Sequence, residues 1–185
     1  TDTIFVNGID VNFTPNPTGG CQPFDVSFTD SSSNLFANNI QWDWEFGNNL
    51  GTANGQNASF TFQDLGQFDV SLTVTDDWGC EVSYTANEAV EVTSPIAEFT
   101  ADTFSCASFP ISFNNTSSGL NLSYEWDFGD GNISTEKNPE HQYLLEGTFT
   151  PCLTITDVYG CSEIICLDDY ISIANPNSSF SLDTS

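Results

Sequence analysis

Two aspartates, the only lysine and the only histidine share one stretch of the chain, YEWDFGDGNISTEKNPEHQY at residues 124–143. Asp127, Asp130 and Asn132 offer oxygen ligands of the kind that calcium prefers, with six to eight needed for a full shell. The same D-x-x-D-G spacing is typical of an ordinary turn. Two interpretations therefore stay open, a calcium loop and a turn that holds no ion. We expect no cofactor to be required, with calcium as the one candidate.

Other residues also invite ligands. Asp157 with Asp168 and Asp169 near a late hairpin form a second candidate calcium set. Trp78 and Tyr159 each stand directly before a Gly-Cys pair at an expected hairpin tip. An exposed aromatic ring there could hold a sugar or a neighbouring domain, because it combines apolar area with a polar edge. The alternative is that each ring packs against its own turn.

Catalysis finds little support in the residue types. Nucleophilic and zinc-dependent hydrolysis need a placed His or Cys with a partner, and the chain has a single histidine. A pair of carboxylates could serve glycoside hydrolysis, but among 26 acidic residues some pair will always meet the distance. We predict that the chain is not an enzyme.

The charge balance limits the partners. The net charge is −25, with one lysine and no arginine to offset the acids. Nucleic acid and anionic membrane surfaces should repel such a chain, because both recruit cationic side chains. No apolar run approaches the roughly 20 residues of a membrane helix. Cations, basic partners and simple solubility are the interpretations of the charge that remain. Surface glycans or proteins are further candidate partners.

The elements that would position these residues belong to a repeat. GQFDVSLTVTDDWGC at residues 66–80 aligns with GTFTPCLTITDVYGC at 147–161 without a gap, and WEFGNN from Trp44 aligns with WDFGDG from Trp126. The repeat divides the chain into the end of a preceding unit (1–9), two complete units (10–94 and 95–175) and the first strand of a following unit (176–185). Such a chain suggests a segment of a longer tandem array, or a subunit that joins its copies head to tail into a fibre.

Apolar residues alternate with polar ones in short runs, which is typical of strands. Six or seven short strands in about 80 residues favour an all-β fold made of tandem immunoglobulin-like sandwiches. Trp44 and Trp126 are expected in the core, and His141 and Tyr143 align with Phe60 and Phe62, which indicates a packed face rather than chemistry. In the second unit the expected strands lie near 96–100, 109–114, 121–128, 140–143, 148–156 and 162–173.

The motifs YEWDFGDG, NPEHQY and GTFTPCLTITDVYGC, in this order, resemble the PKD domain, the immunoglobulin-like module named after polycystic kidney disease protein. The resemblance is fullest over 95–175, since Glu45 and Asn48 replace the motif's aspartates in the first unit. The cysteine-bearing variant resembles PKD arrays of large surface proteins of Bacteroidetes, including gliding adhesins. It implies an extracellular, cell-surface location and a structural or adhesive role beside neighbouring PKD repeats. The alternative is a carbohydrate- or protein-binding accessory module of a secreted hydrolase.

The six cysteines suggest a disulfide framework. Because Cys21 and Cys80 hold the same places in the repeat as Cys106 and Cys161, we predict the bridges Cys21–Cys80 and Cys106–Cys161. A third pair, Cys152 and Cys166, occurs only in the second unit. If that hairpin turns around Tyr159, the two face each other across the strands and should form a bridge. A zinc site is the alternative that we disfavour, because no cluster of His and Cys accompanies them.

Overall fold

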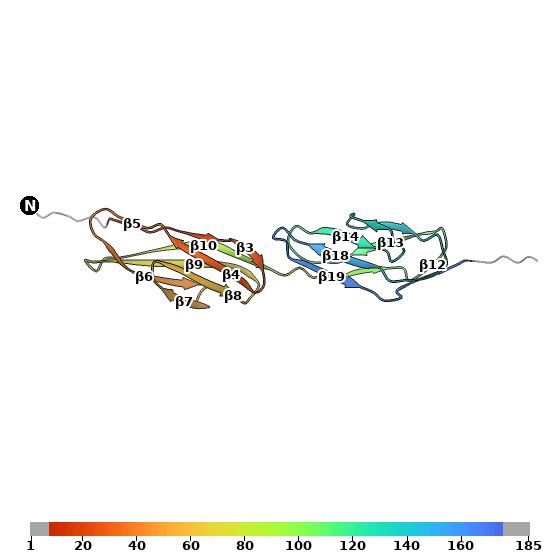
Figure 1. Ribbon diagram of the computed structural model, residues 1–185, viewed down its shortest axis with the longest axis horizontal. Helices are drawn as coiled ribbons and strands as arrows, with labels where there is room; N and C mark the ends of the chain where they lie inside the picture. Colours follow the sequence, from red (N-terminus) through yellow and green to blue (C-terminus); the bar gives the residue numbers. More distant parts are fainter. Residues whose placement is uncertain (1–7, 176–185) are drawn as a thin grey trace, which may run out of the picture. The chain divides into compact units, whose positions relative to one another are not determined.

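The computed structural model describes residues 8–175, in which every regular element is a β-strand (Figure 1). The chain divides into two compact units, residues 1–94 and 95–185. The expected all-β sandwich fold is confirmed. The expected terminal pieces of further repeats lie mostly outside the described residues, at 1–7 and 176–185. Within 8–175 no helix is long and apolar enough to cross a bilayer.

The first domain is a sandwich of two sheets. One sheet has the order β2-β4-β8 and the other β3-β10-β9-β6-β7, while β1 and β5 form a short additional pair. The β9–β10 hairpin lies inside the larger sheet, and β3 pairs with β10 in parallel. The strands are β1 (Ile9–Asp10), β2 (Phe13–Asn16), β3 (Gly19–Cys21), β4 (Phe24–Asp30), β5 (Ser33–Asn34), β6 (Asn39–Phe46), β7 (Gly51–Asn54), β8 (Asn57–Phe62), β9 (Gly66–Asp76) and β10 (Glu81–Thr93).

The second domain repeats this plan with shorter strands. Its sheets have the orders β11-β13-β16, β12-β20-β17 and β15-β14-β18-β19, and β12 adds to β20 in parallel as β3 does to β10. The strands are β11 (Phe99–Ala101), β12 (Phe104–Cys106), β13 (Pro110–Asn115), β14 (Ser123–Asp127), β15 (Ile133–Ser134), β16 (Glu140–Gln142), β17 (Gly147–Phe149), β18 (Cys152–Thr156), β19 (Ser162–Cys166) and β20 (Ile171–Ala174).

Two expected strands of the second domain are each interrupted. The segment 148–156 breaks between β17 and β18 at Thr150 and Pro151, because proline has no N–H to donate to a sheet. The segment 162–173 breaks between β19 and β20 around Asp169, whose φ is +49°. The first domain has a bulge at the equivalent Glu88, with φ of +50°, but β9 and β10 continue through it. The proline thus splits a hairpin that its counterpart keeps whole.

Each domain has its own apolar core, built on the alternating residues that the sequence pattern predicts. Trp44 and Trp126 lie at the centre of the two cores, with 1% and 0% of their surface exposed. Each indole N–H donates to a backbone carbonyl, Trp44 to Gly55 at 2.8 Å and Trp126 to Glu136 at 2.9 Å. The polar atom of each buried ring is therefore satisfied, as burial requires. The predicted core role of both tryptophans is confirmed.

Each domain also has two distinct ends. At the entry end, where the chain comes in, β1 pairs with β5 in the first domain and Asn34 of β5 donates to Asp76 at the tip of the β9–β10 hairpin. At the exit end, β10 finishes beside β3, with Thr93 opposite Cys21. Figure 1 shows β5 and β3 toward opposite ends of this domain. The second domain has the same polarity, with the β18–β19 tip at its entry end and Ala174 opposite Cys106 at its exit end.

Candidate functional site

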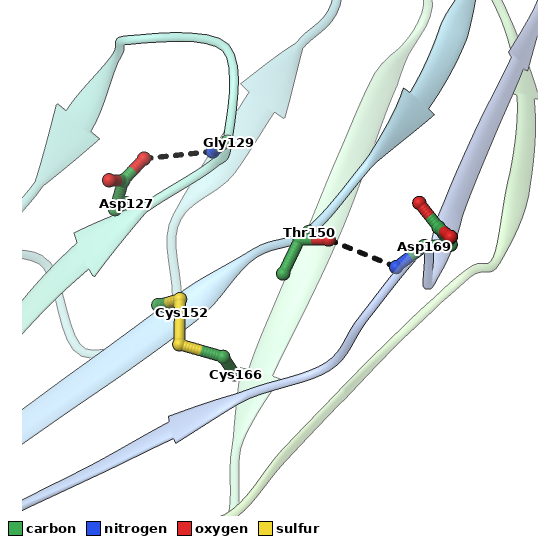
Figure 2. The surroundings of a disulfide bond; sticks show 6 residues. All are labelled: Asp127, Gly129, Thr150, Cys152, Cys166 and Asp169. Atoms are coloured by element: carbon green, nitrogen blue, oxygen red, sulfur yellow. Dashed lines mark hydrogen bonds between the residues drawn. A yellow bond between two sulfur atoms is a disulfide. The ribbon is translucent and has the colours of Figure 1, made fainter.

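The D-F-G-D segment forms a turn that its own side chains close. It follows β14, and Oδ1 of Asp127 accepts the N–H of Gly129 at 2.8 Å (Figure 2). Asp130 accepts twice from Asn132, through Oδ1 from the backbone N–H and through Oδ2 from the side-chain amide, both at 3.0 Å. Gly129 has φ of +79°, and a Cβ there would lie 2.7 Å from the carbonyl oxygen of Thr150, so the turn requires glycine.

His141 on β16 binds to this turn. Its Nε2 lies 2.8 Å from Oδ2 of Asp130, and its ring stacks on Phe128 with centroids 4.0 Å apart. In the first domain Phe60 stacks on Phe46 in the same way, at 4.6 Å. The expectation that His141 occupies the packed position of Phe60 is therefore confirmed. Its contact with Asp130 is an addition that the aligned phenylalanine could not reveal.

Tyr143, the counterpart of Phe62, is 1% exposed and donates its hydroxyl to the carbonyl of Phe128 at 2.9 Å. Burial, followed by the nearby charges of Asp130 and Asp127, raises the pKa of this phenol well above its ordinary value. Tyr143 is therefore a neutral donor at every physiological pH. Its role is to fix the backbone that leads into the turn.

Asp130 is held in its ionised form. Partial burial opposes ionisation, but the hydrogen bond from His141 and then those from Asn132 outweigh it and lower the pKa of Asp130 below its ordinary value. A carboxylate that accepts bonds from three donor groups is suited to closing a turn. It is also less available to a cation, which would have to displace those donors.

The calcium hypothesis stays a prediction. Over residues 8–175 no group of three or more His, Cys, Asp and Glu side chains is placed to hold a metal ion. Asp127, Asp130 and Asn132 are neighbours in one turn, but they bond to the turn itself rather than converge on a common point. The second candidate set is not brought together, because Asp157 lies at the β18–β19 tip, whereas Asp169 follows the far end of β19, where its backbone N–H donates to Oγ1 of Thr150 at 3.0 Å (Figure 2).

The hairpin tips are built identically in the two domains. Asp76 and Asp157 are 3% and 6% exposed, and each accepts two backbone N–H groups across its tip. Asp76 bonds to Trp78 at 3.0 Å and to Cys80 at 2.9 Å, and Asp157 bonds to Tyr159 and Cys161 at 2.9 Å each. Burial opposes ionisation of Asp76, but the N–H groups of Cys80 and Trp78 together with Asn34 and the Cys80 thiol lower its pKa.

The aromatic rings at these tips differ in exposure. Trp78 is 58% exposed and Tyr159 is 37% exposed. Both stand on a hydrogen-bonded turn at the entry end of a domain, the placement that a contact residue needs. A ligand for either ring stays a prediction.

The predicted Cys152–Cys166 bridge is confirmed. The two residues face each other across β18 and β19, with Cα atoms 4.1 Å apart (Figure 2). Their counterparts Ser71 and Thr85 also face each other across β9 and β10, and their hydroxyl oxygens lie 2.7 Å apart. The second domain thus has a covalent bond where the first has a hydrogen bond.

The predicted bridges Cys21–Cys80 and Cys106–Cys161 are wrong. Cys80 and Cys106 carry free thiols, whereas Cys21 and Cys161 are both disulfide-bonded. The physical reason is the polarity of each domain. Cys80 precedes β10, a strand of 13 residues that ends opposite Cys21. At about 3.3 Å per residue this strand separates the two cysteines by roughly 40 Å, far beyond the 7 Å limit between bridged Cα atoms.

One feature of the second domain was missed by the sequence reasoning. A pocket of about 430 Å³ adjoins the Asp130 turn, and its lining residues are Asp130, Asn132, Leu144, Leu145 and Phe149. Leu144 and Leu145 are 72% and 75% exposed, although both are apolar. Two adjacent leucines between a buried tyrosine and a Glu-Gly turn break the alternating pattern, and that break was the available signal.

The geometry defines a class of protein: paired immunoglobulin-like β-sandwiches with disulfides and side-chain-closed turns. The family model of the PKD domain matches residues 9–92 and again 92–173. The chain therefore belongs to the PKD domain family. PKD domains are non-catalytic accessory modules, so these two domains are not an enzyme, as predicted.

Three comparisons show what the chain is similar to. A microbial collagenase of Vibrio alginolyticus is 38% identical over 71 residues, which are 36% of this chain and 9% of that protein. The PKD1 domain of the metalloprotease PrtV from Vibrio cholerae is 32% identical over 43% of this chain and 99% of that domain, with a TM-score of 0.37. The I-band fragment I67–I69 of titin is 12% identical over 93% of this chain and 68% of that fragment, with a TM-score of 0.57, a likeness of fold alone. The chain spans less than a tenth of the length of the curated relatives it matches.

Proposed function

We propose that the two domains are extracellular spacers in a tandem PKD array, which carry load and present a binding end at a cell surface. The observation that carries this proposal is tandem repetition: two PKD matches meet at residue 92 and leave no room for another kind of domain between them. Two separate cores, one of them with a cross-strand disulfide, suit a part that must stay folded outside the cell. The surface adhesins of Bacteroidetes illustrate such arrays.

Single-molecule force spectroscopy on the chain between inert handles tests this function. With all disulfides reduced, we expect two abrupt unfolding events, each releasing roughly 25 nm of chain, as extended domains of about 80 residues would. In the oxidised chain the length released should be shorter, because residues between bonded cysteines, such as the 14 residues of separation enclosed by Cys152–Cys166, cannot extend. A reducing agent should restore the full length. Gradual extension at low force would contradict a load-bearing role.

A second candidate function is favoured by the relatives. The matched regions belong to a microbial collagenase and to a metalloprotease, so the two domains could be an accessory binding module of a secreted hydrolase. Co-sedimentation with insoluble collagen and a glycan array, each with and without calcium, separate the two functions. Saturable binding that Trp78→Ala or Tyr159→Ala reduces would favour the accessory module. No binding, combined with two abrupt unfolding events, favours the spacer.

A further inference from the structure

We propose that Cys80 and Cys106 are the two halves of an intermolecular disulfide, through which copies of this chain join head to tail. The proposal rests on the proposed function in one respect, because a load-bearing array gains from covalent joints. It concerns two residues that no bridge within the chain uses.

The first support is the comparison of equivalent cysteines. Cys80 and Cys161 occupy the same place at the hairpin tip of their domains, and Cys21 and Cys106 occupy the same place beside the last strand. Cys161 and Cys21 are disulfide-bonded, whereas Cys80 and Cys106 are free. The hairpin-tip cysteine is therefore disulfide-bonded in the second domain and free in the first. The cysteine beside the last strand is disulfide-bonded in the first domain and free in the second.

The second support is where the open positions lie. Cys80 is exposed at the entry end of the first domain, and Cys106 is half-buried at the exit end of the second. Within each domain the length of the strands separates the open cysteine from the cysteine at the other end, Cys80 from Cys21 and Cys106 from Cys161. The exit end of one copy and the entry end of the next are the two surfaces that meet when copies join head to tail. The junction would then pair one cysteine of each kind.

The third support is the apolar surface around each thiol. Near Cys80 the loop after β5 bonds to the hairpin tip through Asn38 and Asp77, and large apolar side chains of this end are exposed, namely Leu35 at 80%, Phe36 at 58% and Trp78 at 58%. Near Cys106 the exposed apolar residues are Phe104 at 63%, Phe109 at 63%, Leu144 at 72% and Leu145 at 75%. Exposed apolar groups of this size at both ends favour a contact that removes them from water.

The bond needs an oxidant, which we take to be a small disulfide such as oxidised glutathione. The Cys106 thiolate attacks one sulfur of that disulfide, which forms a mixed disulfide and releases one thiol. The Cys80 thiolate of the second copy then attacks the Cys106 sulfur and releases the other thiol. Two protein thiols lose two electrons and two protons, and one small disulfide becomes two thiols, so the exchange balances.

The experiment uses the purified, oxidatively folded chain in a buffer with oxidised glutathione, followed on non-reducing gels. We expect a ladder of multimers that a reductant collapses, and mass spectrometry of the digest should identify a peptide joined through Cys80 and Cys106. Cys80→Ser and Cys106→Ser should each abolish the ladder, since a chain with one half of the joint cannot extend. An equimolar mixture of the two variants should stop at a heterodimer.

Two further measurements sharpen the result. Leu144→Ser with Leu145→Ser should slow the ladder several-fold if apolar contact aligns the ends, while Ile133→Ser, at a 69% exposed site in β15, serves as the control. Salt should speed joining, because it screens the repulsion between chains of charge −25. Absence of the ladder, or joints of Cys80 to Cys80 and Cys106 to Cys106, would overturn the proposal. Unchanged force-spectroscopy events in Cys80→Ser would show that the spacer function stands without it.

Discussion

Cys152 and Cys166 form a disulfide at the position where Ser71 and Thr85 of the first domain share a hydrogen bond. The members of each pair lie directly opposite each other in the equivalent hairpin of their own domain, with a sequence separation of 14. The chain therefore contains its own control for the effect of this bond.

Replacing the disulfide by its natural counterpart should weaken one domain only. The double variant Cys152→Ser, Cys166→Thr is expected to lower the unfolding free energy of the second domain by about 3 kcal/mol, because a loop of this length is no longer closed in the unfolded chain. Urea unfolding with hydrogen–deuterium exchange measures the two domains separately. An equal loss of unfolding free energy in the first domain would contradict the prediction that this disulfide stabilises the second domain alone.

Removal of the Tyr143 hydroxyl should leave the carbonyl of Phe128 without its buried donor. Tyr143→Phe, which copies Phe62 of the first domain, is expected to lower the stability of the second domain by about 1–2 kcal/mol. The reason is that a buried carbonyl without a hydrogen-bond donor is not compensated for its loss of water. Phe149→Leu, a packing change beside the same ring, is the control for shape. A Tyr143→Phe domain as stable as the parent would show that water replaces the phenol.

The Asp130–His141 contact predicts acid sensitivity of the second domain. The folded-state pKa of Asp130 lies below the ordinary 3.8, so its contribution is complete above that value and is lost as the pH falls through the folded pKa. His141→Phe, which copies Phe60, should lower stability near pH 6 and reduce the further loss as the pH falls below 3.8 and through the folded pKa of Asp130. Denaturant unfolding over this range measures the slope. Glu140→Gln, which removes an exposed carboxylate from the same strand, should leave the slope close to the parent's.

The carboxylates at the hairpin tips predict a local effect on the turns. Asp157→Ala removes the acceptor of the N–H groups of Tyr159 and Cys161, and we expect a loss of about 2 kcal/mol with faster amide exchange at the tip. Asp168→Ala, at an exposed position of the same domain, is the matched control. Equal rates of amide exchange at the tip in the two variants would mean that the turn stays folded without the Asp157 carboxylate.

Much of the fold was predictable because the sequence repeats. Alternation of apolar residues predicted the strands, and alignment of His141 with Phe60 predicted a packed position, since equivalent places in a repeat share an environment. The Cys152–Cys166 bridge was also predictable, because the register of a hairpin follows from its turn. The strand breaks at Pro151 and Asp169 were not predicted from the sequence. The alternating pattern continues through both positions, so it does not indicate where the hydrogen bonds between strands are interrupted.

The sequence by itself determined the family, the strand pattern, the buried tryptophans and the local disulfide, all of which depend on residues that are neighbours in a strand or hairpin. Only the tertiary structure decided which cysteines lie at the same end of a domain. Cys21 and Cys80 recur in the second repeat as Cys106 and Cys161, yet β10 places Cys21 and Cys80 at opposite ends of the first domain, because 13 residues of extended strand span the length of the sandwich. Cys80 and Cys106, which the sequence predicted to form bridges within their domains, are therefore free thiols, one at the entry end of the first domain and one at the exit end of the second.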